Sequence, residues 1–196
     1  MLTIYKGRPA DTTGRLDRET RVYDLLDDIG VVYDRLDHAA AMTMEVCEEI
    51  NAAFGRMTLE EFKAESSDER TKHAIVCKNL FLCNRQKTKF YLLMTPGDKK
   101  FLTKNLSAQI NSARLSFAGE EEMLKYLDIT PGSVSVLGLM NDHDNAVQLL
   151  IDSDVLLSEY VGCHPCVNTS SLRMRTCDLI EKILPAIHHS PVIVNL

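Results

Sequence analysis

The sequence predicts a single α/β domain that spans residues 1–196. Short apolar runs of strand-like composition alternate with segments of helical periodicity, and neither an internal repeat nor a long linker interrupts them. A chain of 196 residues is long enough for one substantial core and marginal for two. Its composition, 45% hydrophobic and 26% charged, is typical of an ordinary globular protein and agrees with one domain.

The first third of the chain predicts helices on either side of a short strand. Apolar residues recur at helical spacing up to Ile29, and Gly30 stops this periodicity. Thr43 stands where a side-chain oxygen can cap the helix that follows. We therefore expect helices over 18–29 and 43–54, a helical turn over 58–62 and a strand over 31–36.

A β-hairpin is expected in the middle of the chain. The apolar run 74–84 can pair with 90–94 across the polar turn 85–89, and Pro96 and Gly97 then end the second strand. The remaining elements follow from the same periodicities. We expect helices over 102–113, 120–127 and 176–188, buried strands over 134–140 and 146–151, a loop over 160–169, and strands over 170–174 and 192–194.

Hydropathy and cysteine usage bear on the compartment. No stretch of 18 apolar residues occurs, so no membrane span is expected. The first residues lack the apolar core of a secretion signal, which makes a cytoplasmic location the expectation. There the six cysteines are expected to be reduced thiols.

Lys78 lies in the middle of the apolar run and is the most unusual residue of the chain. An ammonium group in a buried strand must reach water, find a partner or bind a ligand, because burying it unpaired is costly. The ordinary alternative is a lysine that extends its aliphatic stem to water at a sheet edge.

The charges around Lys78 favour a ligand. The chain carries 22 basic and 28 acidic residues, a net charge of -6. Between Lys72 and Lys104 there are eight basic residues and one acid, so this segment is +7 and the rest of the chain is -13. A local basic segment on an acidic protein suits a focused contact with a polyanion, although a lysine-rich hairpin face is the alternative.

Cys163 and Cys166 form a CxxC pair, which raises redox and metal hypotheses. A thioredoxin-like site needs a helix directly after the pair, and the following Val-Asn-Thr-Ser-Ser is a poor helix start. A zinc site needs a second ligand pair of similar spacing, which is not evident. We therefore expect no metal and no other cofactor.

A distributed set of motifs resembles a known family. Lys-Asn-Leu-Phe-Leu at 78–82 and Lys-Phe-Tyr-Leu-Leu at 89–93 resemble the paired strands of the YbaK/prolyl-tRNA-synthetase-associated editing domains. Within that family the chain looks most like the freestanding prolyl-tRNA deacylases of the ProXp-ala/PrdX group. Further motifs continue the family's order over about residues 23–184: Tyr33, His38 and Thr43, then 115–118, 131–134, 138–142, 164–165 and 168–169.

The resemblance implies a single YbaK-like α/β domain with a mixed, partly barrel-like sheet flanked by helices. It implies a trans-editing hydrolase that removes a wrong amino acid, foremost alanine, from tRNA(Pro). The main partner would be the acceptor end of the tRNA, and prolyl-tRNA synthetase would be a second candidate partner. No membrane partner is expected, and the oligomeric state is left open. Lys78 would be the central catalytic residue, holding the terminal phosphate or ribose and stabilising negative charge.

The remaining site residues also come from the resemblance. The loop from Gly162 to Asn168 would close over the aminoacyl group, and Asn79 would contact it only if the strand twists, because adjacent strand residues face opposite ways. The substrate-binding set is Asn79, Gly162, His164, Pro165, Asn168, His38 and Thr43, with Met44, Val46, Ile75, Leu137 and Leu139 as pocket walls or core.

Two departures from the family pattern leave the substrate open. Ser135 and Val136 stand where the family usually has Thr-Pro, and alanines 39–41 stand where it usually has prolines. Both could reshape the amino-acid pocket. Cys-tRNA(Pro) or another small aminoacyl-tRNA as substrate, a non-catalytic RNA- or protein-binding relative, and a thiol-redox protein are the alternatives.

Overall fold

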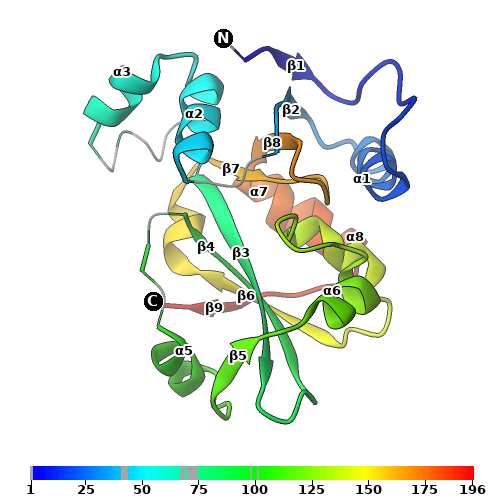
Figure 1. The fold of residues 1–196 in the computed structure, drawn as a ribbon, viewed down its shortest axis with the longest axis vertical. Helices are drawn as coiled ribbons and strands as arrows, with labels where there is room; N and C mark the ends of the chain where they lie inside the picture. Colours follow the sequence, from blue (N-terminus) through cyan, green and yellow to red (C-terminus); the bar gives the residue numbers. More distant parts are fainter. Residues whose placement is uncertain (1, 41–43, 67–68, 70–74, 98, 101) are drawn as a thin grey trace.

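A computed structural model describes the chain except residues 1, 41–43, 67–68, 70–74, 98 and 101. The described residues form nine strands, hydrogen-bonded in the order β1-β2-β8-β7-β3-β4-β6-β9 with β5 also on β3 (Figure 1). The strands are β1 Ile4–Lys6, β2 Tyr33–Asp37, β3 Ile75–Asn84, β4 Phe90–Pro96, β5 Leu115–Phe117, β6 Val147–Asp152, β7 Tyr160–Cys163, β8 Ser170–Arg175 and β9 Val192–Val194.

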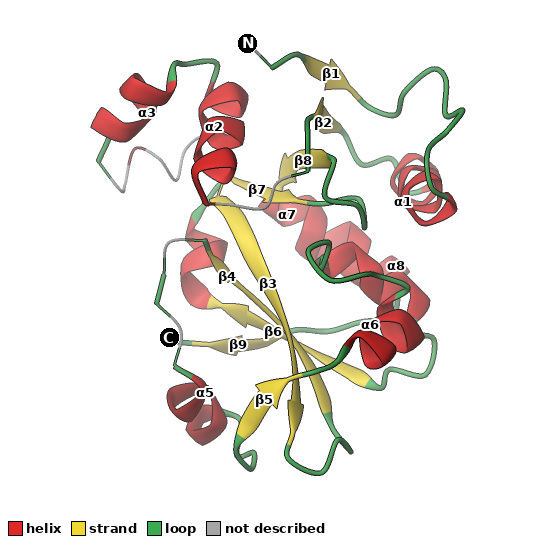
Figure 2. Cartoon of the chain, viewed as in Figure 1, coloured by secondary structure: helices red, strands yellow, loops and turns green. Residues whose placement is uncertain are grey.

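Helices surround this sheet on several sides (Figure 2). They are α1 Asp17–Asp28, α2 Met44–Gly55, α3 Leu59–Ala64, α5 Thr103–Gln109, α6 Glu120–Leu127, α7 Thr176–Asp178 and α8 Leu184–Ala186, with the 3₁₀ helices η1 Val136–Asn141 and η2 Ser153–Leu157 and the π-turn η3 Leu179–Ile183. The predicted mixture of α and β is confirmed. Within the described part of the chain, no helix has the length and apolarity to cross a bilayer.

Strand β3 joins the two parts of the sheet. Its first residues pair in parallel with β7, its middle pairs antiparallel with β4, and its end also pairs with β5. The described pairings leave β1 and β9 at opposite ends of the path, so they do not confirm the barrel-like character.

Both faces of the central sheet are covered, which explains the continuous apolar composition of β4. Leu92 and Met94 belong to the main core together with residues of α1 and the C-terminal helix. The alternate residues Tyr91 and Leu93 belong to a second cluster with Leu106 of α5. Because strand side chains alternate, each face of β4 receives one of these two sets.

The predicted hairpin is confirmed, and helix α6 matches its expected range; the register, with Cys83 opposite Phe90, comes from the structure. Two expectations were wrong. The apolar run 134–140 contains most of η1 instead of a strand, because a short buried apolar run does not distinguish the two by periodicity. Residues 160–163 form β7 instead of a loop, since tertiary pairing with β8 and β3 supplies their partners.

The C-terminal helix is continuous over three segments but not regular. It was predicted over 176–188 and is observed as α7, η3 and α8. Pro185 lacks a backbone N–H and cannot close an ordinary i to i-4 hydrogen bond, so the turn before it widens into a π-turn.

Candidate active site

The candidate site lies where β3 separates from β7. These strands pair only at Ile75–Val161 and Val76–Gly162, after which β3 continues beside β4. Lys78 and His164 each follow the Val76–Gly162 pair by two positions. Two predicted site residues that are 86 positions apart in sequence therefore lie on the two branches of one fork of the sheet.

The Lys78 ammonium is held by backbone carbonyls. Its Nζ donates to the carbonyl oxygen of Lys99 at 2.5 Å and to that of Gly97 at 3.2 Å. Both acceptors lie in the segment that follows β4, and the side chain is partly buried. An ammonium has three N–H donors, so these two bonds, the ones it makes within the described residues, leave one donor for a substrate oxygen.

His38 and His164 lie side by side, with ring centroids 6.3 Å apart. His164 Nδ1 is 3.0 Å from the carbonyl oxygen of Ser170, so Nδ1 carries the proton and Nε2 is the acceptor. Burial lowers the pKa of His164, and the adjacent His38 lowers it further, against the opposing hydrogen bond to Ser170. The His164 ring is therefore neutral at pH 7.

His38 is oriented by neighbours on both sides of its ring. Its Nδ1 is 2.7 Å from the carbonyl oxygen of Ala39, and its Nε2 is 2.9 Å from Ser171 Oγ. The carbonyl can only accept, so Nδ1 donates and Nε2 accepts from the Ser171 hydroxyl. The backbone of His38 also donates to the carbonyl of Thr169, which ties the end of β2 to the 164–169 loop.

Ser135 anchors the 164–169 loop and was missed as a site residue. Its buried hydroxyl donates to the carbonyl oxygen of His164 at 2.5 Å and accepts from the backbone of Leu137 at 3.2 Å. Val136 packs in the main core. The departure from the family pattern at these positions therefore bears on the 164–169 loop, and that departure was the only signal that drew attention to Ser135.

The other predicted site residues are placed as follows. Gly162 and Pro165 are buried and Asn168 is partly buried, all on β7 or the loop after it. Asn79 directs its Nδ2 toward the carbonyl of Cys77 at 3.5 Å, while its buried Oδ1 has no hydrogen-bond partner within the described chain. The contact of Asn79 with substrate stays a prediction. Thr43 lies outside the described residues.

The candidate wall residues divide between core and site. Leu137 and Leu139 are fully buried in the main core, which favours packing over pocket formation. Val46 packs on a small cluster around Leu36 and Phe54. The side chains of Met44 and Ile75 lie outside the described part.

A cavity of about 400 Å³ lies behind the 164–169 loop. Arg15 pairs with Glu19 at 2.5 Å and with Asp37 at 2.7 Å. Arg18 contacts Asp128, outside the lining, at 3.7 Å, and its buried Nη1 has no hydrogen-bond partner among the described residues. Nothing in the sequence predicted this cavity. Its lining comprises Gly14, Arg15, Leu16, Arg18, Glu19, Asp37, Thr130, Ser133, Cys166, Val167, Asn168 and Thr169.

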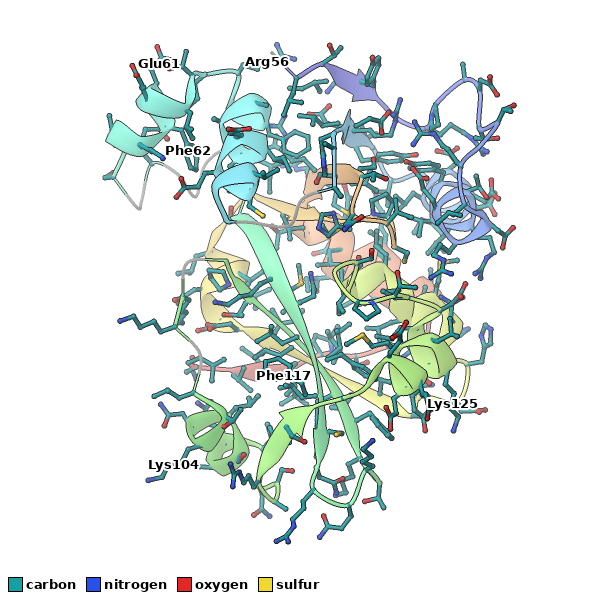
Figure 3. All side chains as sticks on the ribbon, viewed as in Figure 1. Arg56, Glu61, Phe62, Lys104, Phe117 and Lys125 are labelled. Carbon is teal, nitrogen blue, oxygen red and sulfur yellow. The ribbon has the colours of Figure 1, made fainter. Side chains whose placement is uncertain are left out.

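The predicted basic segment does not form one patch at Lys78. The turn 85–89 lies at the far end of the hairpin, about 20 Å along β3 from Lys78. Lys104 lies on α5 and projects from the side of the molecule near β5 (Figure 3). Two other members are partly neutralised, since Lys87 pairs with Glu122 at 2.8 Å and Lys99 pairs with carboxylates of β6 and η2.

The CxxC pair has the environment of structural cysteines. Cys163 and Cys166 are buried and not disulfide-bonded. Burial raises the pKa of Cys163 to about 12 and raises the pKa of Cys166 further. Both remain thiols at neutral pH, which argues against the redox hypothesis, because the thiolate is the reactive form.

Comparison with known proteins gives concordant matches. The model of the aminoacyl-tRNA editing domain matches residues 55–182. The prolyl-tRNA editing protein ProX of Acetoanaerobium sticklandii is 30% identical over 171 residues, covering 87% of this chain and 93% of its own. The prolyl-tRNA synthetase associated domain-containing protein 1 of Mus musculus is 30% identical over 142 residues, covering 70% and 81%.

Solved structures confirm the fold. One, provisionally described as a trans-editing enzyme for prolyl tRNA synthetase, superposes with a TM-score of 0.59 at 15% identity, covering 92% of this chain and 98% of its own. A scaffold protein from work on epitope backbone grafting by computational design superposes with a TM-score of 0.63 at 13% identity, covering 92% and 97%.

Proposed function

Because the chain belongs to the aminoacyl-tRNA editing domain family, we propose that it is a trans-editing deacylase that hydrolyses mischarged tRNA(Pro). The observation that carries the proposal is the placement of Lys78 and His164 on the two branches of the β3–β7 fork, inside the region that matches the family model. The prolyl-tRNA editing activity named for the bacterial relative supports the choice of tRNA.

The proposed reaction is hydrolysis of an activated ester. Water attacks the carbonyl carbon that joins the amino acid to the terminal ribose, the carbonyl oxygen gains negative charge, and the ribose oxygen leaves with a proton from the water. The free N–H of the Lys78 ammonium stabilises this charge or holds the terminal phosphate. His164 presents Nε2 as a hydrogen-bond acceptor, suited to the α-ammonium group of the bound aminoacyl ester.

Alanine is the proposed amino acid, and selection would be by size. A synthetase pocket rejects a smaller amino acid weakly, since each missing methylene changes binding by about 1–3 kcal/mol. An editing pocket too small for proline could accept alanine. Cysteine is the alternative, and the three alanines at 39–41 leave the choice between them open.

A deacylation panel tests the proposal. Purified wild-type chain is mixed with Ala-, Cys- and Pro-tRNA(Pro), and the loss of the ester is followed in time. We expect hydrolysis of Ala-tRNA(Pro) and none of Pro-tRNA(Pro). Preference for Cys-tRNA(Pro) would favour the alternative substrate. Salt-sensitive tRNA binding without hydrolysis of any ester would contradict the deacylase hypothesis and favour a non-catalytic tRNA-binding protein.

Lys78→Ala is the matched variant in the same panel. Removal of one charge-stabilising donor lowers hydrolysis by about 10²–10³-fold in comparable sites. Circular dichroism and thermal unfolding establish that the variant is folded. Wild-type turnover by folded Lys78→Ala would remove Lys78 from the mechanism and leave His164 and the loop as the site.

Two further parts of the proposal concern partners and location. We propose a cytoplasmic protein of one domain that acts on tRNA released from, or presented by, prolyl-tRNA synthetase. Sedimentation of the chain with the synthetase, in the presence and absence of tRNA(Pro), tests that association. If the two proteins do not co-sediment in either condition, the proposed association with the synthetase is wrong, and the two proteins would only act on the same tRNA.

A further inference from the structure

A row of three polar residues crosses the largely apolar central sheet. Lys78 on β3 stands opposite Thr95 on β4. On the other side of β4, the last registered pair with the parallel strand β6 is Met94–Ile151. Thr95 and Asp152 are the next residues of β4 and β6, so they lie beside each other. The Thr95 hydroxyl donates to Asp152 Oδ2 at 3.2 Å, so the three residues lie on three adjacent strands in one transverse row.

Asp152 is the buried end of this row. Its side chain is fully buried, and it accepts three hydrogen bonds from Thr95, Lys99 and the backbone of Asp154. A carboxylate buried to this extent needs such donors, because an unpaired buried charge is strongly destabilising. Its role in capping η2 explains the bond to Asp154, but not the bond to a lysine from the segment after β4.

Lys99 connects Asp152 to Lys78. Its Nζ is 2.9 Å from Asp152 and 2.6 Å from Asp154, and its backbone carbonyl accepts the 2.5 Å hydrogen bond from the Lys78 ammonium. One residue therefore binds the buried carboxylate with its side chain and the candidate catalytic ammonium with its backbone. The ion pairs of the Lys99 side chain restrict the residue whose carbonyl holds Lys78.

The charges of the row give Lys99 a second effect. Asp152 and Lys78 carry opposite charges on the same face of the sheet and would attract each other. The Lys99 ammonium lies against the carboxylate, and the carboxylates of Asp152 and Asp154 outweigh burial and raise the pKa of Lys99. Asp152 is thus neutralised by Lys99, and Lys78 is held by neutral carbonyls that leave its charge for a substrate.

We propose that Asp152 is a positioning residue for Lys78 and acts through Lys99. This inference rests on the proposed function for its catalytic consequence, but its structural part concerns only the Lys78 ammonium. Asp152 fixes Lys99, and the Lys99 and Gly97 carbonyls fix the ammonium. The described hydrogen bonds of Asp152 go to Thr95, Lys99 and Asp154, so its effect on Lys78 is indirect.

The test measures the Lys78 ammonium directly. Full-length wild type, Lys99→Met and Asp152→Asn are labelled with trace acetic anhydride across a pH series, and the modification of Lys78 is quantified by peptide mass spectrometry. Loss of a hydrogen bond to a charged group changes a rate or equilibrium by about tenfold. We expect Lys78 labelling in Lys99→Met to differ from wild type by about tenfold, with a shifted pH midpoint.

Matched variants separate positioning from general damage. Lys182 and Asp178 form an ion pair at 2.7 Å on the C-terminal helix, so Lys182→Met and Asp178→Asn make the same chemical changes outside the row. Lys99→Arg retains the cation and is expected to restore the wild-type labelling profile. If Asp152→Asn unfolds, Lys99→Met and Lys99→Arg decide the proposal, because Lys99 is partly exposed.

Deacylation is measured on the same variants. We expect kcat to fall about tenfold in Lys99→Met with KM little changed, and Lys99→Arg to recover it. Unchanged Lys78 labelling in Lys99→Met, or equal changes in Lys182→Met, would overturn the positioning role. A wild-type chain that hydrolyses no mischarged tRNA(Pro) would overturn the proposed function alone, since the labelling result stands without it.

Discussion

The Ser135 hydroxyl donates a 2.5 Å hydrogen bond to the backbone carbonyl of His164, across 29 positions of sequence. This bond joins the start of η1 to the first residue after β7. It fixes the loop that carries the proposed substrate-binding residues. The loop conformation therefore depends on a buried hydroxyl that the sequence marked only as a departure from the family pattern.

Ser135→Ala is expected to destabilise the fold and loosen the loop. The variant leaves the His164 carbonyl and the Leu137 amide without their partner, which costs about 1–3 kcal/mol for a buried group. Urea unfolding measures the change. Ser135→Thr keeps the hydroxyl and should retain most of the stability, whereas an equal loss in both variants would mean that side-chain volume matters and not the hydrogen bond.

Gly138→Ala is expected to destabilise η1 against its neighbours. A Cβ at Gly138 would lie 3.2 Å from the carbonyl oxygen of Leu127 and would collide with Cδ1 of buried Ile129. Overpacking of this kind costs about 1–3 kcal/mol. Thermal unfolding of Gly138→Ala alone and combined with Ile129→Val, which removes Cδ1, measures the effect, and the double variant should recover part of the loss.

Asp37 is expected to contribute an acid-dependent part of stability. Burial opposes its ionisation, but hydrogen bonds from Arg15 and Arg35 prevail and lower its pKa to about 2. The folded pKa is below the ordinary 3.8, so the stabilisation is present above about pH 4 and is lost as pH falls toward 2. Asp37→Asn should flatten the fall in unfolding free energy over that window, and parallel curves would contradict this.

Thiol reactivity is expected to separate the exposed cysteine from the CxxC pair. Cys177 is exposed, while Cys163 and Cys166 are buried with raised pKa values. In native protein at pH 8 a disulfide reagent should modify Cys177 first, and Cys177→Ser should abolish the fast phase. A fast phase that persists in Cys177→Ser and maps to Cys163 would revive the redox hypothesis.

Much of the secondary structure was predictable because its signals are local. Helix α1 ends at the Gly30 stop, where φ is +65°, and the β3–β4 hairpin has its polar turn in the sequence. β7 was not predicted, because its four residues have no strand periodicity and are defined by β8 and β3 on either side. The 3₁₀ helix η1 was mistaken for a strand for a related reason, since its apolar residues are buried on all sides.

Some of the candidate site residues could also be named from local sequence signals. Lys78 is conspicuous in sequence, because a charge inside an apolar strand needs an explanation, and the sequence motifs also named His38 and His164. Their proximity, with ring centroids 6.3 Å apart, required the pairing of β2 with β8. By itself, then, the sequence determined the α/β class, the hairpin and the identity of the unusual lysine, all of which rest on local periodicity.

Only the tertiary structure decided how that lysine is held. Thr95 and Asp152 carry no sequence signal that connects them with Lys78, Lys99 shares with it only the basic segment, and Ser135 carries no signal that connects it with His164. Hydrogen bonds between residues tens of positions apart depend on strand order and register, which side-chain periodicity does not encode. The same register places the charged row across an apolar sheet and so defines the environment of the Lys78 ammonium.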